Sequence, residues 1–170
     1  MERDYIDGLV EDWIREIGGQ VPLPLAIAAR LWRLASYFRE DLEGVLVGTG
    51  INSESFEVLI LLRIAAPPHR LSPTDLSRGL RVSRGAVTNR MRALVRDGFV
   101  TREGNPLDRR SSWITLTSAG MALVDRLIPS CLVRVDQPLA PLSMIERNNF
   151  ANLLRQLLLS YHDHVPLDVV

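Results

Sequence analysis

The sequence reads Leu71-Ser72-Pro73-Thr74-Asp75-Leu76, then Val82-Ser83-Arg84-Gly85-Ala86-Val87-Thr88-Asn89-Arg90-Met91-Arg92, and later Asp108-Arg109-Arg110 and Ile114-Thr115-Leu116-Thr117. Ser72, with Pro73 at the first helical position, and Ser83 are each suited to begin a short helix. Residues 99–102 and 113–116 read as strands around a polar, Pro- and Gly-containing tip. Two short helices, a tight turn and a two-stranded wing predict a winged helix-turn-helix, in a fold that is mainly α with a small β-wing.

The charge distribution is uneven along the chain. The 20 basic residues are all arginine and are balanced by 20 acidic residues, so the formal net charge is zero. Residues 70–117 carry 10 arginines and four acidic residues, whereas residues 1–57 carry five arginines and 11 acidic residues. The first segment can neutralise the phosphates of double-stranded DNA, and the second would be repelled by them.

Helices are predicted on both sides of this segment. Apolar residues recur every three or four positions over 3–17, 25–47 and 54–66. A further helix begins at Thr117 or Ser118 and must bend or break near Pro129, and Ser143 with Glu146 forms a capping box for the last one. The expected division is 1–51 (N-terminal helices), 52–117 (DNA-binding region) and 118–170 (C-terminal helices).

The terminal helices carry apolar stripes that a single chain would cover poorly. We therefore expect residues 1–51 and 118–170 to pack against a second copy and form a homodimer. Two copies would present two winged motifs to the half-sites of a pseudopalindromic operator, about 10 to 10.5 base pairs apart or a multiple of that spacing.

Composition narrows the class of protein. The chain has 170 residues, of which 46% are hydrophobic, enough for a core. No apolar run is long enough to span a bilayer and no secretory signal is recognised, so we expect a cytoplasmic protein with no membrane partner. Cys131 is the only cysteine, so an intrachain disulfide is excluded. No nucleophile with a base, glycine-rich phosphate loop or metal-ligand cluster is evident, so neither an enzyme nor a cofactor or metal is expected.

The helix that starts after Ser83 is the predicted reader of DNA. A helical projection places Val87, Met91, Leu94 and Val95 toward the core and Gly85, Asn89, Arg92 and Arg96 toward the outside. Gly85 allows close approach to the groove, Asn89 can pair with adenine, Arg84 or Arg92 with guanine or phosphate, and Thr88 can contact a thymine methyl group. Ser83 and the first helical amides suit a phosphate. The alternative is that these arginines only solvate an exposed helix.

The wing tip supplies the remaining predicted DNA contacts. Asp108 can orient a neighbouring arginine so that its guanidinium enters a narrow minor groove. An ordinary salt bridge within the loop is compatible with the same residues. The complete predicted DNA-binding set is Ser83, Arg84, Gly85, Thr88, Asn89, Arg92, Arg109, Arg110 and Ser111.

These residues resemble the MarR family of winged-helix regulators. The family's wing signature is Asp-x-Arg, five residues, then Leu-Thr, and Asp108, Arg110, Leu116 and Thr117 fill it without a gap. The resemblance is specific over about residues 52–127. It implies a dimeric, ligand-modulated transcriptional regulator, most often a repressor.

A narrower resemblance is to the urate-responsive branch of this family, which has an additional N-terminal helix and a similar reader sequence, here Ser83 to Arg90. The resemblance implies a ligand site at Trp13, Glu57, Arg90 and Arg102 for a small anionic, aromatic compound such as urate. Glu57 departs from the aspartate of that branch by one methylene. Two arginines can bind an anionic ring on which a tryptophan stacks, and an anion that pulls Arg90 could tilt the reader helix. The alternatives are core packing or a dimer contact for Trp13, a structural Glu57–Arg90 pair, and a phosphate contact for Arg102.

Two other functions remain open from the sequence. The winged helix could be a protein-interaction module that never binds DNA, although the 10 arginines of residues 70–117 argue against it. Cys131 could make the chain a thiol-based redox-sensing regulator, but it lies among Ile128, Leu132 and Val133, with no activating base nearby in the sequence, so an inert buried thiol is favoured.

Overall fold

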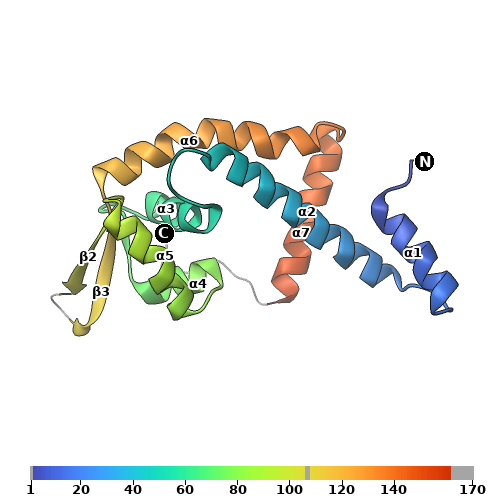
Figure 1. Cartoon of the computed structure of the whole chain (residues 1–170), viewed down its shortest axis with the longest axis horizontal. Helices are drawn as coiled ribbons and strands as arrows, with labels where there is room; N and C mark the ends of the chain where they lie inside the picture. The colour runs from blue at the N-terminus through green and yellow to red at the C-terminus, as the bar shows by residue number, and fades with distance from the viewer. Residues whose placement is uncertain (1, 106–107, 162–170) are drawn as a thin grey trace. The chain divides into compact units, whose positions relative to one another are not determined.

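The computed structural model describes residues 2–105 and 108–161; the side chains of residues 105 and 108–111 are outside this description. The fold is mainly helical with a small antiparallel sheet, as the sequence predicts (Figure 1). Its elements are α1 (Tyr5–Glu16), α2 (Leu23–Leu46), α3 (Ser53–Ile64), β1 (Arg70–Leu71), α4 (Pro73–Leu80), α5 (Arg84–Arg96), β2 (Val100–Asn105), β3 (Asp108–Leu116), α6 (Ser118–Asp136), the 3-10 turn η1 (Gln137–Leu139) and α7 (Met144–Ser160).

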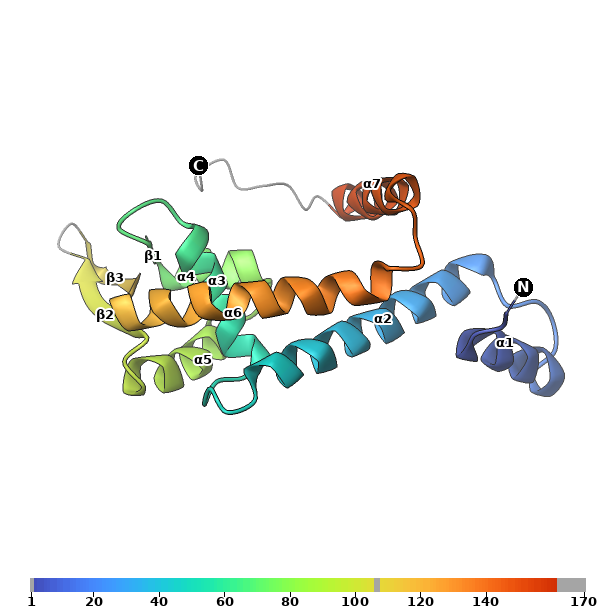
Figure 2. The ribbon, with the colours of Figure 1, turned by 90° about the horizontal axis from the view of Figure 1, so that it is seen from above.

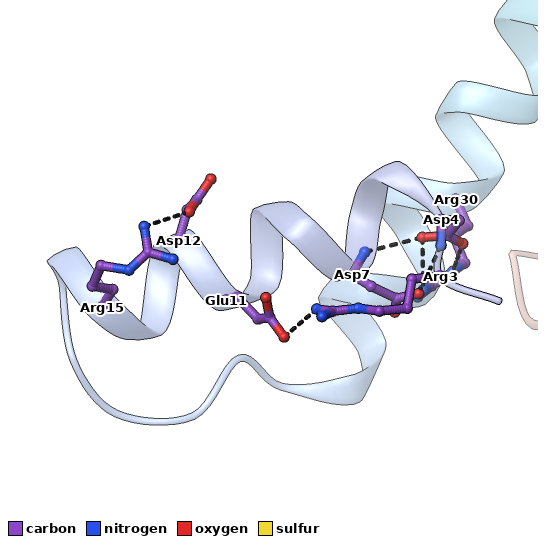
Figure 3. Close-up of polar contacts among 7 residues, drawn as sticks. All are labelled: Arg3, Asp4, Asp7, Glu11, Asp12, Arg15 and Arg30. Carbon is purple, nitrogen blue, oxygen red and sulfur yellow. Dashed lines mark hydrogen bonds and ion pairs between the residues drawn. The ribbon is translucent and has the colours of Figure 1, made fainter. Parts of the chain in front are cut away.

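The chain divides into two compact units, Met1–Asp41 and Leu42–Val170. In the first unit, Arg30 of α2 holds α1 by its N-terminal cap. Its Nε and Nη2 donate to the Asp4 carboxylate at 2.7 and 3.1 Å, and Nη2 also donates to Asp7 at 2.6 Å. Asp4 and Asp7 form the capping box of α1. Figure 3 shows these contacts, together with the ion pairs Arg3–Glu11 and Arg15–Asp12 along α1.

The core of the second unit lies within the winged helix-turn-helix. Helices α3, α4 and α5 pack on one another, and α3 also packs on α6. Leu59, Leu76, Leu94 and Val124 are fully buried at the centre of this core. Because apolar side chains from four helices meet there, each helix in this unit is fixed by tertiary packing as well as by its own capping.

Local capping residues set the helix-turn-helix. Ser72 Oγ accepts from the Asp75 amide and Ser83 Oγ from the Ala86 amide, so both predicted caps are confirmed. Between the two helices, Arg81 adopts a left-handed conformation with a φ of 53°. Ser77 Oγ donates to the Val82 carbonyl at 2.6 Å, and the Val82 amide donates to the Ser77 carbonyl at 3.1 Å. These bonds close the tight turn that directs α5 away from α4.

The sheet has the strand order β1-β3-β2, and both pairs are antiparallel. The two wing strands lie where the sequence predicts them but are longer than the expected 99–102 and 113–116. β1, in which Arg70 pairs with Thr115 and Leu71 with Ile114, was not predicted. A two-residue strand is too short to show an alternating pattern.

The start of α6 is tied to the turn between α5 and β2. Thr117 Oγ1 accepts from the Gly120 amide at 3.0 Å and lies 2.8 Å from the Gly98 carbonyl and 3.0 Å from the Phe99 carbonyl. A Cβ on Gly120 would lie 2.2 Å from the Phe99 carbonyl oxygen, so only glycine fits there. The wing base and α6 are therefore joined through Thr117 and Gly120.

Of the bend or break predicted near Pro129, the break is wrong, because α6 is continuous from Ser118 to Asp136 (Figure 2). Proline removes one helical hydrogen bond, but packing holds the turns before it: Val124 and Leu127 are buried, and Asp125 pairs with Arg63 of α3 at 2.9 Å. The capping box predicted for the last helix is confirmed, with Ser143 and Glu146 at the start of α7. No helix of the described residues has both the length and the apolar character needed to cross a bilayer.

Candidate nucleic-acid interface

Helix α5 has one face in the core and the other in solvent. Val87, Met91 and Leu94 are buried against α3, α4 and β2 and fix the rotation of the helix about its axis. Val95 was also expected in the core, but 43% of it is exposed. It lies in the last turn of α5, where the sequence period alone does not show that the core has ended.

The structure exposes all of the predicted reader residues: Ser83, Arg84, Gly85, Thr88, Asn89 and Arg92. Arg84 and Arg92 make no ion pair with any carboxylate in the described part of the chain. Arg96, which the projection also turned outward, is exposed but bound to Asp97 at 2.7 and 3.0 Å, and hydrogen bonding by Arg96 lowers the pKa of the Asp97 carboxyl. We call Ser83, Arg84, Gly85, Thr88, Asn89 and Arg92 the exposed row of α5. It offers one carboxamide and two guanidinium groups that no described carboxylate pairs with.

Two hydroxyl groups beside this row are already engaged with the helix backbone. Ser83 Oγ accepts from the Ala86 amide at 3.2 Å, and Thr88 Oγ1 donates to the Arg84 carbonyl at 3.0 Å. Both bonds stabilise the first turns of α5, where free amide groups and the positive end of the helix dipole favour an anion such as phosphate.

The predicted wing contacts can be followed only along the backbone. Arg109, Arg110 and Ser111 belong to β3, and their side chains lie outside the described residues. Arg102 of β2 is exposed at the base of the wing, where its Nε donates to Ser112 Oγ at 3.1 Å.

The predicted ligand residues Glu57 and Arg90 are brought together. Arg90 Nη1 donates to Glu57 Oε2 at 3.1 Å, which links α5 to α3. The Arg90 side chain is only 13% exposed, whereas that of Glu57 is 45% exposed. Trp13 belongs to the first unit, where it lines an apolar pocket of about 150 Å³ with Ile6, Leu9, Val10, Val21, Leu25, Ala26 and Ala29.

A polar hollow of about 360 Å³ beside this pair was not predicted. It is lined by the start of α3 and by α5, so that the reader residue Asn89 shares a wall with Arg90. Its residues are Asn52, Glu54, Ser55, Ala86, Asn89, Arg90 and Ala93. No sequence pattern shows that Asn52 and Asn89, which are 37 positions apart, share one hollow.

Burial raises the pKa of the Cys131 thiol. A thiol in this environment stays protonated and reacts slowly with oxidants, which argues against Cys131 as a redox sensor. Among the described residues, no three His, Cys, Asp or Glu side chains are arranged to hold a metal ion.

Comparison with known proteins agrees with this geometry. The sequence profile described as MarR family matches residues 49–111. The HTH-type transcriptional repressor YetL of Bacillus subtilis is 29% identical over 133 residues, which are 78% of this chain and 79% of that protein. The uncharacterized HTH-type transcriptional regulator YkoM of the same organism is 36% identical over 107 residues, 63% of this chain and 68% of that protein.

A similar fold is found among solved structures. The crystal structure of a mutant MarR from E. coli, complexed with operator DNA, has a TM-score of 0.72 at 24% identity and covers 92% of this chain and 99% of that one. Together with this fold, the matched profile and the relatives named as HTH-type transcriptional regulators show a DNA-binding transcriptional regulator rather than an enzyme. The chain belongs to the MarR family.

Proposed function

We propose that the chain is a homodimeric repressor that binds a pseudopalindromic operator and is released from it by a small anionic, aromatic ligand such as urate. The observation that carries this proposal is the exposed row on α5, which buried Val87, Met91 and Leu94 hold in a fixed orientation. A row of this kind on a winged helix is suited to the major groove.

Each residue of the row has a role that its chemistry allows. Asn89 pairs with adenine through its carboxamide, and Arg84 and Arg92 pair with guanine or hold phosphate. Gly85 lets the backbone approach the groove, and the methyl group of Thr88 contacts that of thymine. Ser83 and the first amides of α5 hold a phosphate. On the wing, Arg109, Arg110 and Ser111 contact the minor groove and its phosphates.

The homodimer is supported by apolar side chains in the proposed dimerisation regions, residues 1–51 and 118–170. Helix α7 has no buried residue, although it carries several large apolar side chains. Those that are more than two-fifths exposed are Met144, Ile145, Leu153, Leu157, Leu158 and Leu159. A second copy that covers them removes this apolar surface from water and sets the distance between two copies of α5.

The ligand response is supported by the Glu57–Arg90 pair. In the proposed site, Arg90 and Arg102 bind the anionic ring and Trp13 stacks on it, while Glu57 competes with the ligand for Arg90. Because Arg90 lies on α5, its partner affects the position of the reader helix. In this proposal α5 has two positions, one that fits DNA and one that does not. A ligand that replaces Glu57 as the partner of Arg90 binds the second position more tightly, and it therefore lowers the affinity for DNA. Repression is proposed because YetL is named a repressor.

The test begins with selection of the bound sequence from random double-stranded oligonucleotides. The account predicts two half-sites about 10 to 10.5 base pairs apart, or a multiple of that spacing, and a mass of two chains by light scattering. Urate should then release the selected duplex in a fluorescence anisotropy titration. A monomer in solution or a single half-site would contradict the dimer, and a duplex that urate at millimolar concentration does not displace would contradict the ligand.

A further inference from the structure

A further cleft, separate from the pocket at Trp13 and the hollow beside Arg90, lies in the winged helix. It is formed by the end of α3, β1, α4 and strand β3. Its volume is about 520 Å³, within the range of small-molecule sites. The residues that line it include Leu61, Pro67, Pro68, Arg70, Arg78 and Trp113. None of these residues belongs to the ligand set Trp13, Glu57, Arg90 and Arg102.

Arg70 is the cation available in this cleft. Its guanidinium carbon lies 4.8 Å from the centre of the Trp113 ring, so one face of the group is stacked. Stacking leaves the N–H donors at the edges of the guanidinium plane free, and in this geometry they match the two oxygens of a carboxylate. No described carboxylate forms an ion pair with Arg70.

The acidic residue of the cleft is already engaged elsewhere. Asp75 Oδ2 accepts from Ser72 Oγ at 2.5 Å and from the Ser72 amide at 3.3 Å, as part of the capping box of α4. Its other oxygen lies 3.7 Å from Arg78 Nη1. The two arginines and one carboxylate leave the cleft with an excess of one positive charge.

The rest of the wall is apolar and rigid. Pro67 and Pro68 have fixed φ angles, and Ala66, Leu61 and Leu71 add hydrocarbon surface. Gly79 lets α4 lie close to α3, because a Cβ there would be 2.9 Å from Leu61 Cδ1. An apolar wall beside a stacked guanidinium fits an aromatic ring that carries an anionic group.

We infer that this cleft binds a small planar aromatic carboxylate, with the carboxylate on the edge of Arg70 and near Arg78 and the ring against Pro67, Pro68 and Leu61. The occupant contacts α4, which packs against the reader helix α5, and Trp113 of the wing strand β3. The cleft is therefore a second place from which a ligand can act on the DNA-binding module, independent of Arg90.

The test is a calorimetric titration of the full chain with 2-naphthoate. The expected result is saturable binding that Arg70→Gln weakens about tenfold or more, because a charge-assisted hydrogen-bonded pair is lost. The neutral isostere 2-naphthamide should bind at least tenfold more weakly than the acid. Arg126→Gln, an exposed arginine on α6 outside the cleft, is the matched control and should leave binding unchanged. Arg90→Gln removes binding at the ligand site proposed above, and the binding that Arg70→Gln weakens should remain in Arg90→Gln, which separates the two sites.

Three outcomes would overturn the inference. They are the absence of 2-naphthoate binding up to its solubility limit, equal binding to the parent and to Arg70→Gln, and equal binding of acid and amide. Loss of 2-naphthoate binding in Arg90→Gln but not in Arg70→Gln would assign the compound to the other site. If Arg70→Gln only lowered the affinity for DNA, Arg70 would be a phosphate contact and the cleft no ligand site.

Discussion

Arg90 Nη1 of the reader helix lies 3.1 Å from the Glu57 carboxylate of α3. This pair joins α5, which presents Asn89 and Arg92, to α3, which packs in the core of the second unit. Any anion that competes with Glu57 for Arg90 must therefore act on α5 itself.

Arg90→Ala should remove the response to urate and leave most of the DNA affinity, because Arg90 is largely covered and lies beside the exposed row. Glu57→Gln should do the opposite and tighten urate binding by no more than about fivefold, since Glu57 is partly exposed and such pairs contribute little. Anisotropy titrations of DNA with and without urate measure both effects. Equal urate responses in Arg90→Ala and in the parent would exclude this switch.

Gly120→Ala should destabilise the fold, because its Cβ would lie 2.2 Å from the Phe99 carbonyl oxygen, a backbone atom that cannot move alone. The expected loss in the free energy of unfolding is about 2 to 3 kcal/mol. Gly44→Ala is the control: it lies within α2 with no atom near the new Cβ and should gain about 0.5 to 1 kcal/mol from helix propensity. Unfolding of both variants in guanidinium chloride measures their free energies of unfolding. Equal values for Gly120→Ala and Gly44→Ala would contradict the close contact at Gly120.

The attachment of α1 to α2 through Arg30 should weaken as the pH becomes acidic. Hydrogen bonds from Arg30, and then from the Asp7 amide, lower the pKa of Asp4 below its usual value. Because the folded pKa is the lower one, the contribution is fully present above the unfolded pKa of about 3.9 and is lost as the pH falls through the folded pKa.

Hydrogen-exchange protection factors of the α1 amides measure this dependence. They should fall below about pH 4 in the parent. Asp4→Asn should show lower protection already at pH 6 and a weaker dependence on acid. If the parent and Asp4→Asn followed the same curve, Asp4 would not be the titrating group.

Peroxide should leave DNA binding unchanged, because burial raises the pKa of the Cys131 thiol and keeps it protonated. The parent and Cys131→Ser should bind the selected duplex equally before and after treatment. A loss of binding in the oxidised parent that Cys131→Ser does not show would revive the redox-sensing alternative.

Features that depend on neighbouring residues could be predicted from the sequence. Ser72, Ser83 and Ser143 cap their helices as expected, because a cap needs only a side-chain oxygen and an amide three residues later. The outward face of α5 was also predicted correctly up to Arg92, because buried Val87 and Met91 follow the helical period.

Features that depend on residues far apart in the sequence could not be predicted. Val95 follows the same period but lies beyond the core. Helix α6 continues past Pro129 because Val124 and Leu127 are buried in the core and Asp125 pairs with Arg63, 62 residues earlier. The stacking of Arg70 on Trp113 comes from the pairing of β1 with β3. This pairing could not be predicted, because a two-residue strand shows no alternating pattern. The cleft beside them was missed for the same reason.

The salt dependence of the affinity decides whether α5 and the wing bind DNA. We expect log Kd of the selected duplex to depend steeply on log salt concentration, and Arg110→Ala to reduce the slope by about one, the contribution of one phosphate contact. Arg126→Gln on α6 should keep the slope of the parent. A slope that is the same in the parent and in Arg110→Ala, or a chain that binds no duplex at low salt, would contradict the claim that α5 and the wing hold DNA.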